Sequence, residues 1–518
     1  MKKTPARDAT SPERLLALAR ERFGVQQFRR GQRALIEAVL RGEDALGILP
    51  TGAGKSLTYQ LPSLLLPHPV LVVSPLISLM QDQQDKLGEL EIPAAKLNST
   101  LRAQEERDTV EQVLEGGARL IYVTPERLEN PEYLTLLKHE GVSLFVVDEA
   151  HCVSSWGHDF RPAYLALSEA RKQLGNPPLL ALTATATPEV IEDITKQLGA
   201  KHPRLVQLGV ERKNLRLEVE RTTNEEHKRE YLQRFLSETE GAGIIYAATI
   251  KKAAELHAWL EEQGISAGLY HGRLAASERT QTQQRFMEGS LQVMVATNAF
   301  GLGIDKQDLR FVIHYHFPDS LESYYQEAGR AGRDGEPARV VLLYRLEDKR
   351  LQSYFLGGKY PRRDESLRVL TELHTGDTLT GLVQRTEIPE RRIKVILAQL
   401  RNAGLVESRG KKLVALRAVE NEAELGSLLA HYEARRRTDR SRLELMMRYA
   451  QTGQCRTHFL NDYFSEESAL TCGHCDNCVA NDAEDRPPRQ VARAHEAEQR
   501  LERLVASSVG NVDASEVV

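Results

Sequence analysis

The stretch PTGAGKS occupies residues 50–56 and directly follows the apolar run LGIL at residues 46–49. A glycine loop between a buried strand and a helix lets backbone N–H groups close around phosphate oxygens. In such a loop Lys55 would reach the β and γ phosphates of a nucleotide, and the Ser56 hydroxyl would bind Mg²⁺. The usual pattern has glycine at the first position of the motif, where this chain has Leu49. The order of strand, loop and helix nevertheless predicts a phosphate-binding loop.

An acidic pair follows a second apolar run, LFVV at residues 144–147, which ends in Asp148-Glu149-Ala150-His151. Phosphoryl transfer to water needs a metal clamp and a positioned nucleophile. Asp148 can hold the Mg²⁺ and Glu149 can orient the attacking water, and we group His151 with them as a catalytic residue. The tetrapeptide DEAH means little alone, but about 90 residues beyond a phosphate loop it predicts nucleotide hydrolysis.

Short apolar runs alternate with helical patterns over residues 11–200, and a second series of the same kind begins after residue 240. Fully apolar strands that alternate with helices predict a parallel sheet covered on both faces. The fold class is therefore α/β, with one domain at residues 1–205 and a second at 206–350.

The sequence pattern changes at residues 361–418. Three short helical patterns are followed there by a segment of alternating apolar and polar residues that turns at Arg409-Gly410. This order is typical of a winged helix, and the alternative is a generic small helical module. We place the winged-helix-like domain at 351–425. A partly disordered tail is expected at 481–518.

Four of the five cysteines, at 455, 472, 475 and 478, form the pattern C-x16-C-x2-C-x2-C. Thiolates two residues apart on a turn can share one tetrahedral Zn²⁺, and four protein ligands indicate a structural site. An iron–sulfur cluster is the rival interpretation of four cysteines. We therefore expect a zinc-binding domain at 426–480 with Cys455, Cys472, Cys475 and Cys478 as ligands, and Cys152 as a core thiol.

Further motifs follow one another in a fixed order along both α/β segments. They are Phe23-Gly24, Phe28-Arg29 and Gln32, then SPLISLM at 74–80, TPERL at 124–128, TATAT at 183–187, YHG at 270–272, VATNAFGLGIDK at 295–306 and QEAGRAGRDG at 326–335. With these motifs the chain resembles the RecQ DNA helicases of superfamily 2, over roughly residues 14–345 and 430–480.

The resemblance implies two RecA-like domains that bind ATP between them and drive 3′→5′ unwinding of DNA. It implies that Gln32 grips the adenine edge, which suits the paired donor and acceptor of an amide. Arg330 and Arg333 would face the ATP and stabilise charge on the γ-phosphate, and the alternative is a surface ion pair. The expected nucleotide contacts are Phe23, Arg29, Gln32, Thr51, Gly52, Gly54, Lys55, Ser56 and Gln326.

The segment SSWGHDFRP at 154–162 resembles the aromatic-rich loop of the family. Aromatic side chains can stack on single-stranded bases, and an arginine can meet phosphate. The alternative is that the tryptophan only packs at the domain edge. The candidate DNA contacts in this loop are Ser155, Trp156, His158, Phe160 and Arg161.

The net charge of −4, from 69 basic and 73 acidic residues, excludes a uniformly basic surface. Residues 361–418 nevertheless hold 12 Lys or Arg against 7 Asp or Glu, and residues 431–456 hold 7 against 3. Such local excess is the expected footprint of phosphate contacts, although 431–456 also suits a solvated helix face. Further candidate DNA contacts are Arg391, Arg392 and Lys394. The winged-helix candidate precedes the cysteines, whereas the family generally places it after them.

We expect ATP, Mg²⁺ and Zn²⁺ as cofactors, and single-stranded and tailed or forked duplex DNA as partners. A single-stranded-DNA-binding protein is a further candidate partner. No secretory signal or apolar run of membrane-spanning length is present, so we expect a cytoplasmic, nucleoid-associated monomer. Two other functions remain open from the sequence: a catalytically silent DNA-binding regulator, and an RNA helicase.

Overall fold

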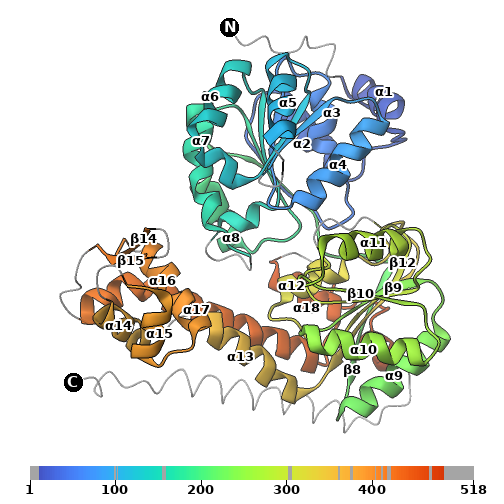
Figure 1. The fold of residues 1–518 in the computed structure, drawn as a ribbon. Helices are drawn as coiled ribbons and strands as arrows, with labels where there is room; N and C mark the ends of the chain where they lie inside the picture. The colour runs from blue at the N-terminus through green and yellow to red at the C-terminus, as the bar shows by residue number, and fades with distance from the viewer. Residues whose placement is uncertain are drawn as a thin grey trace. The chain divides into compact units, whose positions relative to one another are not determined.

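The computed structural model describes residues 11–482 except 99–100, 102, 155–158, 302–305, 360–361, 374–376, 403, 410–411, 417–421 and 466–468. Two compact units divide the chain (Figure 1). The first holds the segments before residue 318, Glu322–Tyr344 and the part from Arg448 onward. The second holds Pro318–Leu321 and Arg345–Met447.

The first sheet has seven strands in the order β3-β4-β2-β5-β6-β1-β7, and all its pairings are parallel. Its strands are β1 Ala45–Ile48, β2 Val70–Val73, β3 Ala94–Leu97, β4 Leu120–Val123, β5 Leu144–Val147, β6 Leu179–Thr183 and β7 Arg204–Gln207. Alternate strand residues point to two separate apolar cores, one on each face. This confirms the predicted parallel sheet with two covered faces.

Helices cover both faces of this sheet. One core includes residues of α1 Pro12–Phe23, α2 Gln32–Leu40, α3 Leu57–Ser63 and α4 Ile77–Glu89. The other includes residues of α5 Ala103–Leu114, α6 Pro131–Glu140, α7 Leu167–Gln173 and α8 Pro188–Gln197. Short 3₁₀ turns lie at Pro125–Glu129, Ala150–Val153 and Pro162–Ala166.

The second sheet has six parallel strands in the order β10-β11-β9-β12-β13-β8. Its strands are β8 Leu215–Arg221, β9 Ala242–Tyr246, β10 Ala267–Tyr270, β11 Val293–Ala296, β12 Leu309–His314 and β13 Ala338–Tyr344. Its helices are α9 Glu225–Glu238, α10 Ile250–Glu262, α11 Ala276–Met287 and α12 Leu321–Ala328. The sequence did not predict β8, because this edge strand alternates apolar and charged residues next to a polar stretch.

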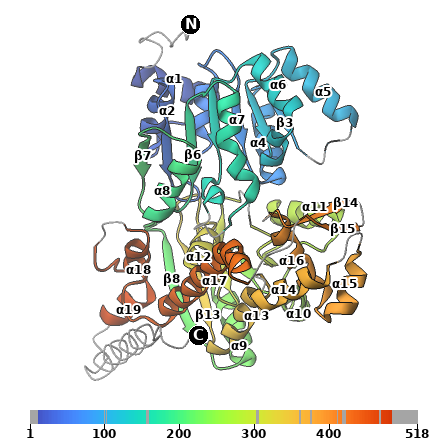
Figure 2. The same cartoon turned by 90° about the vertical axis from the view of Figure 1, so that its left-hand side faces the viewer.

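The second unit contains the three helices and the hairpin that the sequence predicts (Figures 1 and 2). The elements are α13 Lys349–Lys359, α14 Arg363–Glu372, α15 Leu379–Thr386, α16 Glu390–Asn402, β14 Val406–Arg409 and β15 Lys412–Ala415. Strands β14 and β15 pair antiparallel. The three helices α14 to α16 and the hairpin share an apolar core, so they close on themselves as a module.

The long helix α17, Glu422–Gln451, leads back into the first unit, where α18 Arg456–Tyr463 and α19 Asp476–Asp482 follow. Both short helices contact β8, beside which they lie in Figure 2. None of the helices in the described part of the chain combines the length and the apolar character that a membrane crossing requires.

Candidate active site and metal centre

A pocket of about 370 Å³ lies at the carboxyl ends of the first sheet's strands and is also lined by residues on either side of β12 in the sequence. Of the fourteen residues predicted to bind or hydrolyse the nucleotide, all except Phe23 and His151 line it. These twelve are Arg29, Gln32, Thr51, Gly52, Gly54, Lys55, Ser56, Asp148, Glu149, Gln326, Arg330 and Arg333. Phe23 instead ends α1 and packs against the core.

The phosphate loop takes its shape from two glycines with left-handed backbone. Gly52 has φ +85° and Gly54 has φ +76°. A Cβ at Gly54 would collide with Gln32 Nε2, so a side chain there would displace the Gln32 amide. The glycines therefore leave the loop's backbone open toward the pocket, next to Lys55 and Ser56.

The side chains of Arg29 and Gln32 bind the phosphate loop itself. The Arg29 N–H donates to Gln32 Oε1 at 2.8 Å, and Gln32 Nε2 donates to the Gly54 carbonyl at 2.9 Å. The Arg29 guanidinium donates to the Gly52 carbonyl. These contacts attach the start of α2 to the loop, and both side chains still line the pocket.

Asp148 is buried at the end of β5, close to Lys55. Burial, and next the charge of Glu149, raises the pKa of Asp148 to about 7, although Lys55 opposes the shift. A hard divalent cation prefers oxygen ligands and would favour the ionised carboxylate. The carboxylate of Asp148 and the hydroxyl of Ser56 line the same pocket and form a donor set that fits Mg²⁺.

Glu149 presents a buried carboxylate oxygen with an unused hydrogen-bonding capacity. Its Oε2 has no hydrogen bond to any residue that the structure describes, although His151 Nδ1 lies 3.3 Å away. His151 Nδ1 is instead 3.0 Å from Thr183 Oγ1 on β6. A buried acceptor without a partner is costly unless something fills it. This oxygen can accept a hydrogen bond from a water, while His151 lies behind it and outside the pocket.

The two predicted arginines lie in the segment at 329–333, which we call the arginine loop. A Cβ at Gly329 would be 3.2 Å from Thr51 Cβ, and one at Gly52 would be 3.4 Å from Arg333 Cγ. The arginine loop therefore touches the phosphate loop. Arg330 is buried, and its Nε has no hydrogen-bond partner among the described residues. A buried guanidinium N–H at a phosphate pocket fits an anionic ligand.

The aromatic-rich segment is described only in part, because Ser155, Trp156 and His158 lie outside the described residues. Arg161 donates to Asp159 Oδ2 at 3.2 Å and to the Pro75 carbonyl at 3.3 Å. Tyr164 OH donates to the Asp148 carbonyl at 3.1 Å. Arg161 is therefore hydrogen-bonded to the chain just after β2, and Tyr164, three residues farther on, is hydrogen-bonded to the end of β5.

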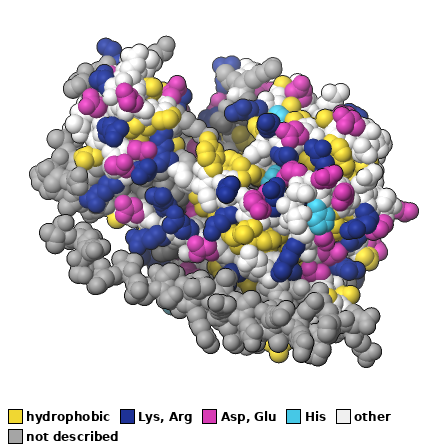
Figure 3. Space-filling model, turned by 90° about the horizontal axis from the view of Figure 1, so that it is seen from below, with side chains coloured by type: hydrophobic (Ala, Val, Ile, Leu, Met, Phe, Trp, Pro, Cys, Tyr) yellow, Lys and Arg dark blue, Asp and Glu magenta, His cyan; other side chains and the backbone are white. Residues whose placement is uncertain are grey.

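Charged side chains of both signs are interspersed over the face in Figure 3. On α16, Arg392 is largely buried, forms a 2.7 Å ion pair with Glu365 and donates to the Gly357 carbonyl. Lys394 is exposed and pairs with Glu390 at 2.6 Å. The side chain of Arg391 lies outside the described residues. Of these three candidate DNA contacts, the structure gives Arg392 a role within the module and leaves Lys394 at the surface.

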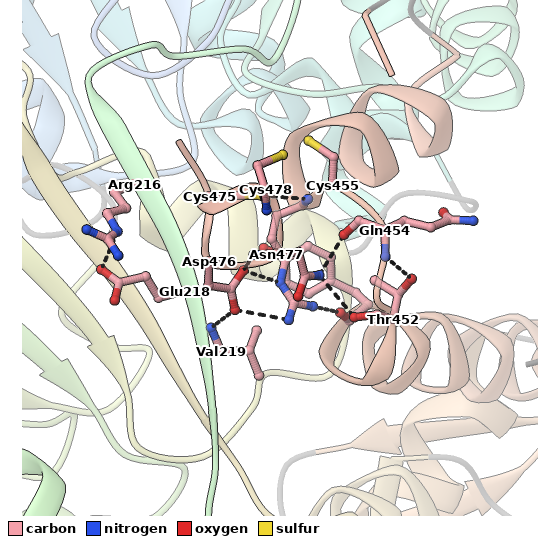
Figure 4. A network of polar contacts seen from close by, with 12 residues as sticks. Arg216, Glu218, Val219, Thr452, Gln454, Cys455, Cys475, Asp476, Asn477 and Cys478 are labelled. Atoms are coloured by element: carbon pink, nitrogen blue, oxygen red, sulfur yellow. Dashed lines mark hydrogen bonds and ion pairs between the residues drawn. The ribbon is translucent and has the colours of Figure 1, made fainter. Parts of the chain in front are cut away.

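The four clustered cysteines lie together, and three of them, Cys455, Cys475 and Cys478, are labelled in Figure 4. Their sulfur atoms all lie within 4.8 Å of one another, and no cysteine of the chain forms a disulfide. A tetrahedral Zn²⁺ with Zn–S bonds of about 2.3 Å would place its sulfurs about 3.8 Å apart. The cluster therefore fits zinc. Burial opposes ionisation of Cys472, but hydrogen bonds from Thr457 and from backbone N–H groups lower the pKa of its thiol to about 6.

Asp476, between two of these cysteines, connects the cluster to the second sheet (Figure 4). Its carboxylate accepts two hydrogen bonds from the buried Arg456, at 2.9 and 3.1 Å. It also accepts the Val219 N–H at 2.9 Å, on the edge strand β8. Helix α18, which follows Cys455, also contacts α12, where Tyr463 OH donates to Glu322 Oε1 at 2.7 Å.

Some residues of the pocket escaped the sequence analysis. Leu79 lies within the SPLISLM motif but was not singled out there, and the rest belong to no motif that the analysis used. Tyr59 follows Ser56 by three residues, so the helical period could have placed it beside the loop. Apart from Leu79, the others carry no comparable signal. The missed residues are Val25, Gln27, Leu57, Tyr59, Leu79, Gln83 and Gln307.

Solved structures share the fold at low sequence identity. The DNA-bound structure of the DUF1998 helicase MrfA matches with a TM-score of 0.55 at 18% identity, over 82% of this chain and 64% of that one. Dbp5 of S. cerevisiae with Gle1 matches with a TM-score of 0.53 at 20% identity, over 68% and 93%.

Three family models match successive parts of the chain. They describe a DEAD/DEAH box helicase at residues 29–194, a helicase conserved C-terminal domain at 227–335 and RecQ zinc-binding at 415–479.

Curated relatives match across these segments. The probable ATP-dependent DNA helicase RecS of Bacillus subtilis is 41% identical, over 76% of this chain and 77% of its own length. The ATP-dependent DNA helicase RecQ of Synechocystis sp. is 36% identical, over 88% and 96%. The chain spans only about half of some others, such as RecQ of Pasteurella multocida at 51%. Together with the pocket and the cysteine cluster, these matches show that the chain belongs to the RecQ helicase family.

Proposed function

We propose that this protein is an ATP-dependent DNA helicase that moves along single-stranded DNA with 3′→5′ polarity and unwinds duplexes in recombination, repair and replication. One observation carries the proposal. A single pocket brings together the phosphate loop, the acidic pair after β5 and the arginine loop of the second sheet. Phosphate binding, water activation and charge stabilisation are the three requirements of nucleotide hydrolysis.

Each side chain has a role in this proposal. Lys55 and the backbone of the phosphate loop bind the β and γ phosphates, and Ser56 and Asp148 hold the Mg²⁺. The metal neutralises phosphate charge when bound. Glu149 accepts a hydrogen bond from the attacking water. Arg330 and Arg333 stabilise charge on the γ-phosphate.

Movement along DNA follows from the two-sheet construction of the site. A nucleotide that contacts both sheets favours a closed arrangement, and its hydrolysis removes that preference. Single-stranded DNA bound across both sheets would thereby be advanced in steps. We propose Phe160 and Arg161, with the neighbouring Ser155, Trp156 and His158, as part of the DNA path. Arg161 is hydrogen-bonded to the Pro75 carbonyl after β2, and the nearby Tyr164 is hydrogen-bonded to the Asp148 carbonyl at the end of β5.

We further propose the domains 1–205, 206–350, 351–425, 426–480 and 481–518, with zinc bound by the four clustered cysteines of the fourth. A single-stranded-DNA-binding protein is a proposed partner. The protein is proposed to act as a monomer in the cytoplasm, associated with the nucleoid. The net charge of −4 supports DNA contact through local patches only.

The ATPase rate with single-stranded DNA, with RNA and with no nucleic acid tests this function. We expect strong stimulation by DNA and loss of turnover in Lys55→Ala, because that variant removes the cation that meets the phosphates. The control is Lys251→Ala, which changes an 88% exposed lysine on α10. DNA-stimulated turnover by a clean preparation of Lys55→Ala would refute the site. Stimulation by RNA instead of DNA would identify an RNA motor.

A further inference from the structure

We propose that Arg212 is a positioning residue for ATP hydrolysis, which holds the arginine loop at the pocket from the segment that connects the two sheets. The inference rests on the proposed function, since it assigns a rate effect to the same site. Arg212 is not among the residues that line the pocket, so it would act through Arg330.

Arg212 contacts the arginine loop on both sides of Arg330. It lies between β7, which ends at Gln207, and β8, which begins at Leu215. Its Nη1 donates to the Gly329 carbonyl at 2.9 Å, and its Nη2 donates to the Gly332 carbonyl. One planar guanidinium thus fixes the backbone before and after the arginine that enters the pocket.

Asn214, two residues after Arg212, also binds the backbone at the end of the arginine loop. Its Nδ2 donates to the Gly332 and Glu336 carbonyls, each at 2.8 Å. Gly332 has φ +55°, and a Cβ there would be 2.5 Å from Asn214 Nδ2. The turn that ends the arginine loop is therefore built tightly around this amide.

The opposite side of the arginine loop presses on the phosphate loop. Gly329 lies against Thr51, and the aliphatic part of Arg333 lies against Gly52. The guanidinium of Arg330 itself lies close to Gly301, where a Cβ would be 3.2 Å from Arg330 Nη2. The loop is thus confined between Arg212 on one side and the phosphate loop on the other. Without Arg212 the Gly329 carbonyl, next to Arg330, loses this hydrogen bond, whereas Asn214 still holds the Gly332 carbonyl.

A small shift of Arg330 should affect the rate of hydrolysis more than the affinity for ATP. Displacing a catalytic group by about 1 Å can cost on the order of a hundredfold in rate. Ground-state binding of the phosphates depends on Lys55 and the phosphate loop, which Arg212 does not contact in the described structure. We therefore expect loss of Arg212 to lower kcat and to leave KM for ATP nearly unchanged.

The test uses three single variants of the full chain, Arg212→Ala, Arg212→Lys and Arg330→Ala. A fourth protein combines Arg212→Ala with Arg330→Ala. The matched control is Arg339→Ala on β13, whose half-buried guanidinium forms a two-point pair with Glu218 at 2.8 and 2.9 Å. The readouts are kcat and KM of DNA-stimulated ATP hydrolysis, the affinity for a non-hydrolysable ATP analogue, and Tm.

We expect Arg212→Ala to lower kcat by about thirtyfold or more, with KM and analogue affinity within about twofold of the wild type. Arg212→Lys should recover only part of the rate, because a single ammonium replaces the planar fork. The combined variant should be no slower than Arg330→Ala alone, since Arg212 acts through Arg330. If Arg212→Ala unfolds, Arg212→Lys must still lower kcat without raising KM.

The inference is overturned if Arg212→Ala keeps the kcat of Arg339→Ala, if its loss appears in KM, or if it slows the Arg330→Ala enzyme further. The proposed function fails separately. In that case the wild type shows no DNA-stimulated hydrolysis, or Lys55→Ala keeps it.

Discussion

Asp148 is a carboxylate of the pocket whose pKa is strongly raised in the folded chain. Its pKa of about 7 in the folded chain, raised first by burial and then by Glu149, lies well above the ordinary value for an aspartate. The folded state therefore binds an extra proton, and this group's contribution to stability falls as the pH rises from about 4 to about 7. Above pH 7 the carboxylate is charged and ready for a cation.

Mg²⁺ and the proton therefore compete for Asp148. We expect the affinity for Mg²⁺ with an ATP analogue to weaken below pH 7, up to about tenfold per pH unit, and to level off above it. Calorimetric titration between pH 6 and pH 8 measures this. Asp148→Asn serves as the reference. The nucleotide's phosphates titrate in the same way with both proteins, but only the wild type has the Asp148 carboxylate. The same pH dependence in both proteins would contradict the role of Asp148.

At the scale of single residues, the motifs predicted which residues line the pocket better than they predicted the hydrogen-bond and ion-pair partners of side chains. Residues in motifs that follow strand ends were placed correctly at the pocket, because the carboxyl ends of parallel strands meet at one edge of a sheet. The partner of Arg392 could not be predicted in this way, since Glu365 lies on another helix, 27 residues away. The same holds for Gln32, which was expected to grip the adenine edge and whose amide also donates to the Gly54 carbonyl of the phosphate loop.

Strand β8 is one of the elements that the sequence did not reveal, and it is the one to which Asp476 of the cysteine region is hydrogen-bonded. Its burial is irregular, so the apolar run that identifies the central strands is missing. Asp476 accepts one of the N–H groups of this edge strand, at Val219, and pairs with the buried Arg456. Cysteine spacing predicted the cluster but gave no information about which strand it joins.

We expect Asp476→Asn to destabilise this junction by roughly 2–3 kcal/mol, because the buried Arg456 loses its counter-charge. Zinc should then reach a chromogenic chelator at lower urea concentration than in the wild type. Glu255→Gln is the control, since its pair with Lys252 is 38% exposed on the carboxylate side and should contribute less than about 1 kcal/mol. Equal zinc release from the two variants would show that Asp476 does not support the cluster.

For the whole molecule, the sequence predicted two parallel sheets, a helical module with a hairpin, and a cysteine cluster, in that order. The order could be read because apolar strands, amphipathic helices and closely spaced cysteines leave different patterns in a sequence. The two sheets and the module each have their own apolar core or cores. The module at 363–416 precedes the cysteines and has a closed apolar core. The sequence does not reveal the role of this module. Arg392 on its third helix, a candidate DNA contact, forms an ion pair with Glu365 inside the module.

Replacing residues 361–418 by a short flexible linker tests whether this module binds duplex DNA. The segment carries 12 basic and 7 acidic residues, so its loss should weaken duplex affinity and reduce the salt dependence of binding. ATPase activity stimulated by single-stranded DNA should persist, because the pocket lies outside the segment. Unchanged duplex affinity and unchanged unwinding would rule out this role.

Unwinding of matched duplexes with a 3′ or a 5′ single-stranded tail tests the central claim most directly, with the wild type and Lys55→Ala side by side. The account predicts that the wild type separates the 3′-tailed duplex only when ATP and Mg²⁺ are present, leaves the 5′-tailed duplex paired, and loses all unwinding with Lys55→Ala. Strand separation that survives Lys55→Ala, or that starts from the 5′ tail, would contradict it.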